Sequence, residues 1–202
     1  MTRPLPPHLP RYTITFQPDP HGLGEWARKT FIDTGSPLTN EDHKHLREAS
    51  IGWLWTGTPS EHRGRRLAGE ARMPRTGGAR WSQLMGVAQL EGWFGKVPDF
   101  LITIDADLAT QATDDQFCAL IEHELYHCGQ QTGLFGEPLF TQEGRPRYAI
   151  RGHDVEQFIG VVERYGAEAA GVTQMIEAAK RGPILQDGVI PLACGTCARK
   201  AA

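Results

Sequence analysis

Two histidines with a glutamate between them form the segment of this chain whose residue types and spacing most directly predict chemistry. The segment is His123-Glu124-Leu125-Tyr126-His127. Two imidazoles four residues apart lie on one face of a helix, where both can bind the same divalent ion. The intervening carboxylate can then accept a proton from a water molecule that the ion activates. The segment predicts a zinc-dependent hydrolase of peptide bonds, with His123 and His127 as metal ligands and Glu124 as general base.

A catalytic zinc site needs a third protein ligand, because two imidazoles leave its coordination incomplete while the fourth position is kept for water. His153 is the only other histidine downstream of the motif, and it opens a segment with helical spacing of apolar residues. These residues are Val155, Phe158, Ile159 and Val162. We therefore expect His153 to be the third ligand, held at the first turn of a packed helix. Glu156 and then Asp154 are the alternatives, since zinc also accepts carboxylate oxygens.

The motif does not identify the donor that would help zinc to stabilise the oxyanion of the transition state. Tyr126, Tyr148 and Arg151 lie close to the expected ligands in the sequence. For each of these side chains we expect a structural rather than a catalytic role.

The motif is expected on a helix that begins near residue 114. Thr113 and Gln116 form a capping-box pattern, which satisfies two amide groups that a helix start leaves unpaired. Gly129 allows the chain to leave the helix soon after His127. An apolar stripe at helical spacing predicts that one face packs on a core. This stripe consists of Cys118, Ile121, Leu125 and Cys128, whose two thiols are expected to be unbonded core groups.

The elements around the motif are predicted to form a small sheet with several helices. Apolar spacing and the capping pair Thr39-Asn40 predict helices at residues 22–32, 40–49, 81–94 and 175–180. Alternating apolar side chains predict strands at residues 51–55, 66–73 and 99–105. The first two strands are expected to pair with each other across the turn between them. Core positions are expected for Trp53, Trp55, Trp81 and Trp93.

The length of 202 residues, with 40% hydrophobic residues, predicts one folded domain rather than two. We expect an N-terminal extension at residues 1–20, a domain at residues 21–182 and a C-terminal tail at residues 183–202. The tail carries Cys194 and Cys197, which supply only half of the ligands of a structural zinc site. The expected fold class is α+β, a small zincin-like domain. In it, a short mixed sheet packs on the motif helix, and a ligand-bearing helix follows.

Charge and hydropathy argue against two classes of partner. The chain has 21 Lys and Arg against 24 Asp and Glu, a formal charge of −3, so it offers no general basic surface to nucleic acid. The local cluster His62-Arg63-Gly64-Arg65-Arg66 is expected to be a solvated turn. The N-terminus lacks the apolar run of a secretory signal, and no apolar stretch reaches membrane-spanning length. We therefore expect a cytoplasmic protein, whose oligomeric state the sequence does not define.

Beyond the motif, two longer segments resemble the putative phage metallopeptidase family. They are residues 119–128 around the motif and residues 152–166, which begin Gly152-His153-Asp154-Val155-Glu156 and close with Arg164-Tyr165-Gly166. The upstream pair Trp53-Leu54-Trp55 and the run from Pro98 to Thr103 are also similar, so the resemblance spans roughly residues 20 to 166. More distantly, the chain resembles the SprT-like and minigluzincin-like zincins. The SprT-like resemblance implies His153 as third ligand, and the phage resemblance implies the cytoplasm of a host cell.

Two alternative functions remain open from the sequence. One is a catalytically silent zinc-binding protein of a phage or prophage, with a structural or host-interaction role. The other is a SprT-like protease that acts on DNA-associated proteins, although this chain lacks the complete zinc ribbon that those relatives often carry. For the favoured peptidase, the expected partners are a protein or peptide substrate and Zn²⁺.

Overall fold

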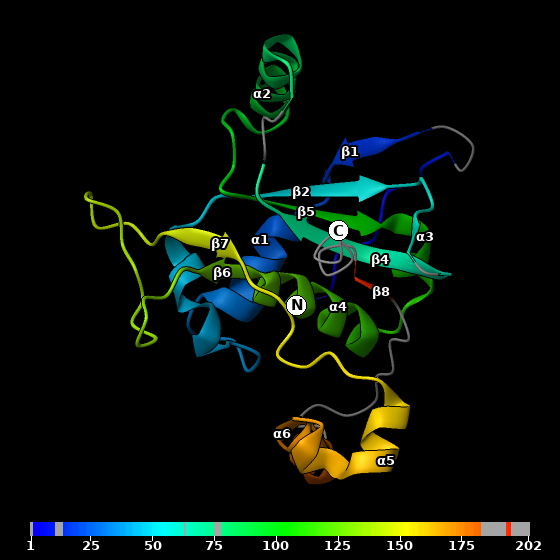
Figure 1. The fold of residues 1–202 in the computed structure, drawn as a ribbon. Helices are drawn as coiled ribbons and strands as arrows, with labels where there is room; N and C mark the ends of the chain where they lie inside the picture. Colours follow the sequence, from blue (N-terminus) through cyan, green and yellow to red (C-terminus); the bar gives the residue numbers. More distant parts are fainter. Residues whose placement is uncertain (1, 11–13, 63, 75–77, 183–192, 195–202) are drawn as a thin grey trace.

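The computed structural model describes residues 2–10, 14–62, 64–74, 78–182 and 193–194. Figure 1 shows a mixed β-sheet with the motif helix α4 (Asp114–His127) lying across one face. The strands follow the order β1-β2-β5-β4-β3, and β8 also pairs with β4. Their bounds are β1 (Phe16–Pro18), β2 (Ile51–Thr56), β3 (Glu61–His62), β4 (Arg65–Arg72), β5 (Phe100–Asp105) and β8 (Ala193–Cys194). The predicted α+β class with a small mixed sheet is confirmed.

β5 lies at the centre of the sheet because its side chains are apolar on both faces. Phe100, Leu101, Ile102 and Ile104 are fully buried. β2 runs parallel to β5, and β4 runs antiparallel to it on the other side. The predicted pairing of β2 with β4 is therefore wrong. The more apolar β5, which comes later in the chain, takes the place between them.

Aromatic side chains join α4 to the sheet and to the N-terminal helices. The N-terminal helices are α1 (Leu23–Ala27), the π-helix η1 (Arg28–Ile32) and the 3-10 helix η2 (Glu41–Glu48). The ring centroid of Trp26 in α1 lies 5.6 Å from that of Phe117 in α4, and Phe117 stacks on Trp55 of β2 at 6.4 Å. Trp53 and Trp55 are buried, as predicted. This core anchors α4 against the sheet.

Among the residues that the structure describes, only part of the opposite face of the sheet is covered. α2 (Arg80–Phe94) packs its C-terminal half there, through a small cluster of Leu90 with Leu54 and Leu101. Its N-terminal half stands away from the sheet (Figure 1), so Trp81 is 77% exposed. The predicted core position of Trp81 is wrong, since the amino acid type alone does not place a helix end over a sheet.

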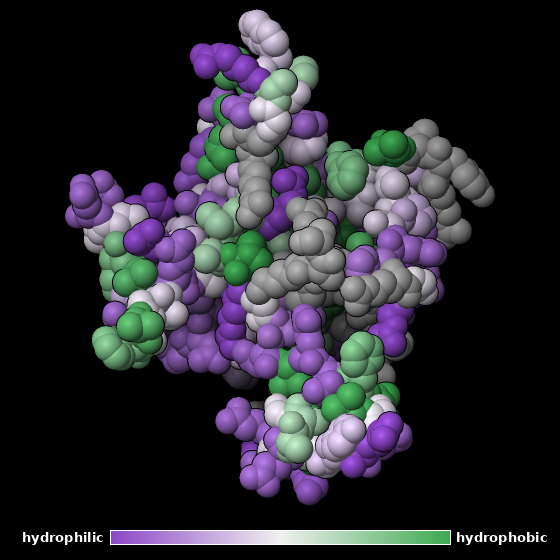
Figure 2. Space-filling view, in the orientation of Figure 1, coloured by the Kyte–Doolittle hydropathy of each residue, from purple (hydrophilic) through white to green (hydrophobic). Residues whose placement is uncertain are grey.

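The predicted helix opening at His153 is also wrong. α5 (Ile159–Ala169) begins later and is followed by α6 (Thr173–Arg181), and neither helix contains a buried residue. Figure 2 shows hydrophobic side chains on the surface of this pair, and Phe158 is 80% exposed. The chain around Arg151 is extended instead, because the Arg151 amide donates to the carbonyl oxygen of His127 at 2.9 Å and continues a β ladder.

That ladder is a second, two-stranded sheet of β6 (Cys128–Gln130) and β7 (Tyr148–Ile150). β6 follows α4 directly, and the chain between the strands projects from the body (Figure 1). The pairing returns the chain to the end of α4 just before His153. The loop between motif and third histidine thus has a β-hairpin as its base.

The first residues contact the body as well. Arg3 donates to the carbonyl oxygens of Ala109 and Ala112 at 3.2 and 2.8 Å, and it forms an ion pair with Asp114 at the start of α4. The two carbonyls lie at the end of α3 (Ala106–Gln111). The expected boundaries at residues 20 and 182 stay a prediction.

The local basic cluster is partly neutralised within the fold. Arg66 donates to both carboxylate oxygens of Asp105, at 2.9 Å each, and Asp105 is buried. Arg65 is exposed, and Arg63 lies outside the described residues. Because one of its three arginines serves a buried ion pair, the cluster is a weaker candidate for phosphate binding than its sequence suggests.

Candidate metal centre

The motif helix begins and ends where the sequence predicts. Thr113 and Gln116 form the predicted capping box. The backbone amide of Gln116 donates to the Thr113 hydroxyl at 3.3 Å, and the backbone amide of Thr113 donates to the side-chain oxygen of Gln116 at 3.0 Å. Ile121, Leu125 and Cys128 of the predicted stripe are fully buried. Glu124 and His127 are also buried, because the sheet covers that face of α4 too.

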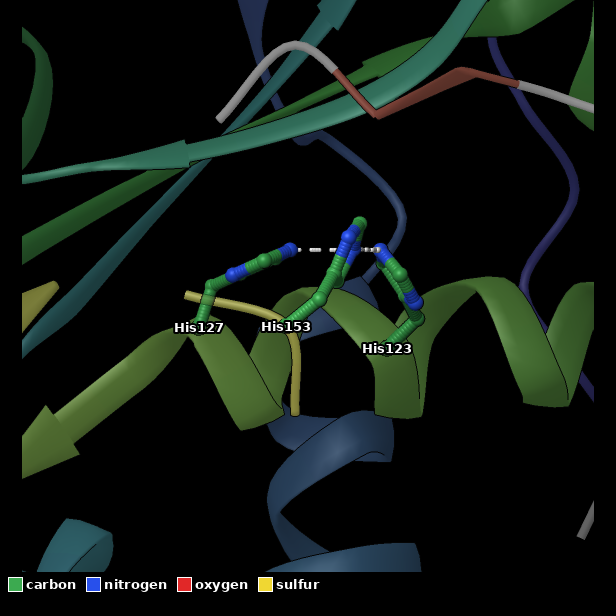
Figure 3. Close-up of side chains that lie close together, drawn as sticks. All are labelled: His123, His127 and His153. Atoms are coloured by element: carbon green, nitrogen blue, oxygen red, sulfur yellow. Dashed lines mark hydrogen bonds between the residues drawn. The ribbon is translucent and has the colours of Figure 1, made fainter. Parts of the chain in front are cut away.

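The three candidate ligands meet at one point above α4, as Figure 3 shows. His123 Nε2 lies 3.2 Å from His127 Nε2 and 3.2 Å from His153 Nε2. In a tetrahedral site with Zn–N bonds of about 2.0–2.1 Å, ligand nitrogens lie about 3.3 Å apart. All three ligand atoms fall within 4.8 Å of one another. The donor set and its spacing therefore fit a zinc ion.

Hydrogen bonding and burial favour the form of imidazole that binds metals. His127 Nδ1 lies 2.7 Å from the carbonyl oxygen of Arg151, so Nδ1 carries the proton and the Nε2 lone pair points to the cluster. Burial, followed by repulsion from His127 and His153, lowers the pKa of His123 to about 4. Burial also lowers the pKa of His153. These shifts favour the neutral form of the His123 and His153 rings, which is the form that binds a metal.

The structure does not bring the two alternative third ligands into this cluster. Asp154 forms an ion pair with Arg151 at 2.5 Å. Glu156 Oε1 lies 3.7 Å from Nδ1 of His153, the ring nitrogen opposite the one in the cluster. Among the described residues, the group that could hold an ion consists of the three histidines alone. The Glu156 carboxylate therefore lies on the side of the His153 ring that faces away from the cluster.

Glu124 lies under β4, where a glycine makes room for it. Its side chain is fully buried, and a Cβ added to Gly69 would lie 2.6 Å from Glu124 Oε1. Any other residue at this position would collide with the carboxylate. Gly69 was not among the residues that the sequence singled out, because its role depends on contact between two distant segments.

Two polar residues near the end of α4, Asp42 and His45, were given no role from the sequence. The Tyr126 hydroxyl accepts from Asn40 Nδ2 at 2.8 Å and donates to Asp42 at 3.1 Å. His45 Nε2 lies 2.7 Å from the carbonyl oxygen of Cys128, and burial lowers the pKa of His45. Asp42 lines the pocket that contains the three histidines. These contacts support a structural role for Tyr126, and no sequence pattern connects residues 40–45 with the motif.

The other two oxyanion candidates have different surroundings. The Arg151 guanidinium lies 5.7 Å from the centre of the Tyr126 ring and pairs with Asp154, at the rim of the histidine pocket. The Tyr148 ring packs edge-on against Phe100, with centroids 5.2 Å apart. Arg151 is therefore close enough to the pocket to contact a ligand, whereas Tyr148 packs on the core.

Comparison with known proteins supports the chemistry that the geometry allows. Within the described residues, no helix is both long and apolar enough to span a membrane. No curated protein and no solved structure gives a significant match to the chain. A family model described as putative phage metallopeptidase matches residues 24–180, which include the motif helix and His153. The resemblance inferred from the sequence is confirmed, and the chain belongs to the putative phage metallopeptidase family.

Proposed function

We propose that this protein is a zinc metallopeptidase, with His123, His127 and His153 as zinc ligands and Glu124 as general base. The observation that carries the proposal is the convergence of three imidazoles, two of which lie on the same helix as a buried carboxylate. A zinc ion held there would lower the pKa of a bound water toward about 7 and polarise the peptide carbonyl. A metal held for stability alone would not require a carboxylate in that place.

Glu124 would take the proton of the attacking water and later pass it to the leaving amine. β4 and the apolar side of α4 exclude solvent from this carboxylate, which strengthens its interactions with a reacting group. His127 would keep its orientation through the Arg151 carbonyl, which lies 2.7 Å from its Nδ1. Arg151, at the rim of the pocket, is placed to meet a substrate carbonyl or carboxylate.

The test is hydrolysis of unfolded, fluorescently labelled casein by the purified full chain, with metal content measured in the same sample. We expect about one zinc per chain, loss of cleavage after chelation and recovery when zinc is restored. A protein that holds zinc but cleaves neither casein nor a mixed peptide library would instead be the catalytically silent zinc-binding protein. Cytoplasmic location in a host stays a prediction that this test does not address.

Replacing Gly69 with alanine should impair hydrolysis without removing the metal. The new Cβ would lie 2.6 Å from Glu124 Oε1, so the carboxylate must move. We expect kcat to fall by roughly 100-fold, the scale of a misplaced general base, with the zinc content unchanged. The matched control is Gly86→Ala in α2, where an added Cβ meets no atom within 4 Å. Equal activity of the two variants would contradict the assigned role of Gly69.

A further inference from the structure

A segment close to the C-terminus adds a strand to the sheet beside the proposed active site. β8 (Ala193–Cys194) pairs in parallel with β4, with Ala193 opposite Leu67 and Cys194 opposite Gly69. Figure 3 shows this short strand next to β4, above the three histidines. Gly69 is the residue that lies against Glu124. The C-terminal segment is thus paired with the part of β4 that covers the proposed general base.

The paired stretch of β4 is an edge at which a strand can be added. On one side, Gly69 pairs with Ile104 of β5, inside the sheet. On the other side, β3 pairs with Arg65 and Arg66, and the Leu67 amide donates to the carbonyl oxygen of Ser60 at 2.8 Å. From Leu67 to Gly69 the strand on this side is β8. An exposed sheet edge binds an extended peptide through backbone hydrogen bonds, which depend little on sequence.

We propose that β8 occupies, in cis, the edge of β4 at which an extended peptide would otherwise pair, so that the C-terminal segment competes with peptide substrates. The partner that fits this edge is an unfolded segment, because a helix or a paired strand has no backbone groups to offer. The competition with substrate rests on the proposed peptidase function, whereas the occupancy of the edge does not.

The shortness of β8 suits a reversible contact. It pairs through two residues, and the register shifts between Leu67 and Gly69, so the ladder is interrupted. Such a pairing is weak between separate molecules, but a tether raises the local concentration of the segment to the millimolar range. A substrate must therefore displace the segment, and it can do so when it offers a longer run of extended backbone.

The test uses a double variant, Ala193→Pro with Cys194→Pro, in the full chain. Proline has no amide hydrogen and cannot join the ladder. The matched control is Ala201→Pro with Ala202→Pro, two prolines in the same tail outside β8. Glu124→Gln is added to both proteins for the binding measurements, so that cleavage does not complicate them. Circular dichroism spectra that match the parent protein show that both variants are folded.

Two measurements report on occupancy of the edge without any catalysis. Hydrogen–deuterium exchange at the amides of β4 should be at least about fivefold faster in the β8 variant than in the control. A fluorescein-labelled synthetic peptide with the sequence of residues 187–202 should bind the β8 variant about tenfold more tightly than the control, by fluorescence anisotropy. Equal exchange and equal binding in the two proteins would overturn the proposal.

A third measurement separates occupancy from regulation. With Glu124 restored, kcat/KM for labelled casein should be roughly fivefold to tenfold higher in the β8 variant than in the control. If exchange and peptide binding change but neither protein cleaves casein, the pairing of β8 stands and the peptidase function fails. If both proteins cleave casein equally, peptidase function stands and competition by the C-terminal segment is refuted.

Discussion

His153→Ala is expected to yield a protein that no longer retains zinc through dialysis. The substitution removes one of three converging imidazoles and leaves His123 and His127 as a two-ligand site, which is incomplete for catalytic zinc. Loss of a residue that only hydrogen-bonds to a metal ligand already lowers the affinity for the metal by about 10–100-fold. Loss of a ligand itself should therefore lower the zinc affinity by more than about 100-fold. Elemental analysis after dialysis, followed by competition with a chromophoric chelator, measures both quantities.

The control for this variant is His8→Ala, because His8 is an exposed histidine outside the cluster. It should keep about one zinc per chain. If His153→Ala retained zinc with near-normal affinity, the three-histidine site would be contradicted. Glu156 and Asp154 would then be the candidates for the third ligand. Glu156→Gln and Asp154→Asn would then distinguish these two, since only the true ligand should lose the metal.

Glu124→Gln should keep the zinc and lose nearly all hydrolysis. Glutamine has the shape of glutamate and fits beneath Gly69, but its amide cannot accept the proton of the attacking water. General bases contribute about 10²–10⁴ in rate, so kcat/KM should fall by about that factor. Hydrolysis of labelled casein and zinc analysis of the same preparation provide the two values. Full activity in this variant would remove Glu124 from the mechanism.

Glu122→Gln is the matched control on the same helix. The Glu122 carboxylate accepts from Asn40 Nδ2 at 2.8 Å and lies 3.8 Å from the buried His43, so its contacts are with the η2 region rather than with the metal cluster. This variant should hydrolyse casein within a few-fold of the parent rate. A comparable loss in both variants would mean that the effect of Glu124→Gln comes from the helix as a whole.

Local patterns correctly predicted features that depend only on residues close together in the sequence. The structure confirms three of them: the capping box at Thr113, the buried stripe of α4 and the apolar run of β5. The pairing of β2 and β4 was wrong because strand order depends on competition among all strands, including one that comes later. The helix at His153 was wrong because backbone pairing with His127 holds that stretch extended.

The sequence by itself determined the chemistry of the donors, because helix geometry places two histidines four residues apart on one face with a glutamate between them. Only the tertiary structure decided how His153 approaches them: β6 and β7 pair and return the chain to the end of α4. The tertiary structure also decided that Gly69 of β4 covers Glu124 and that β8 pairs with β4. These contacts join segments far apart in the chain, where no local spacing or propensity specifies which surfaces meet.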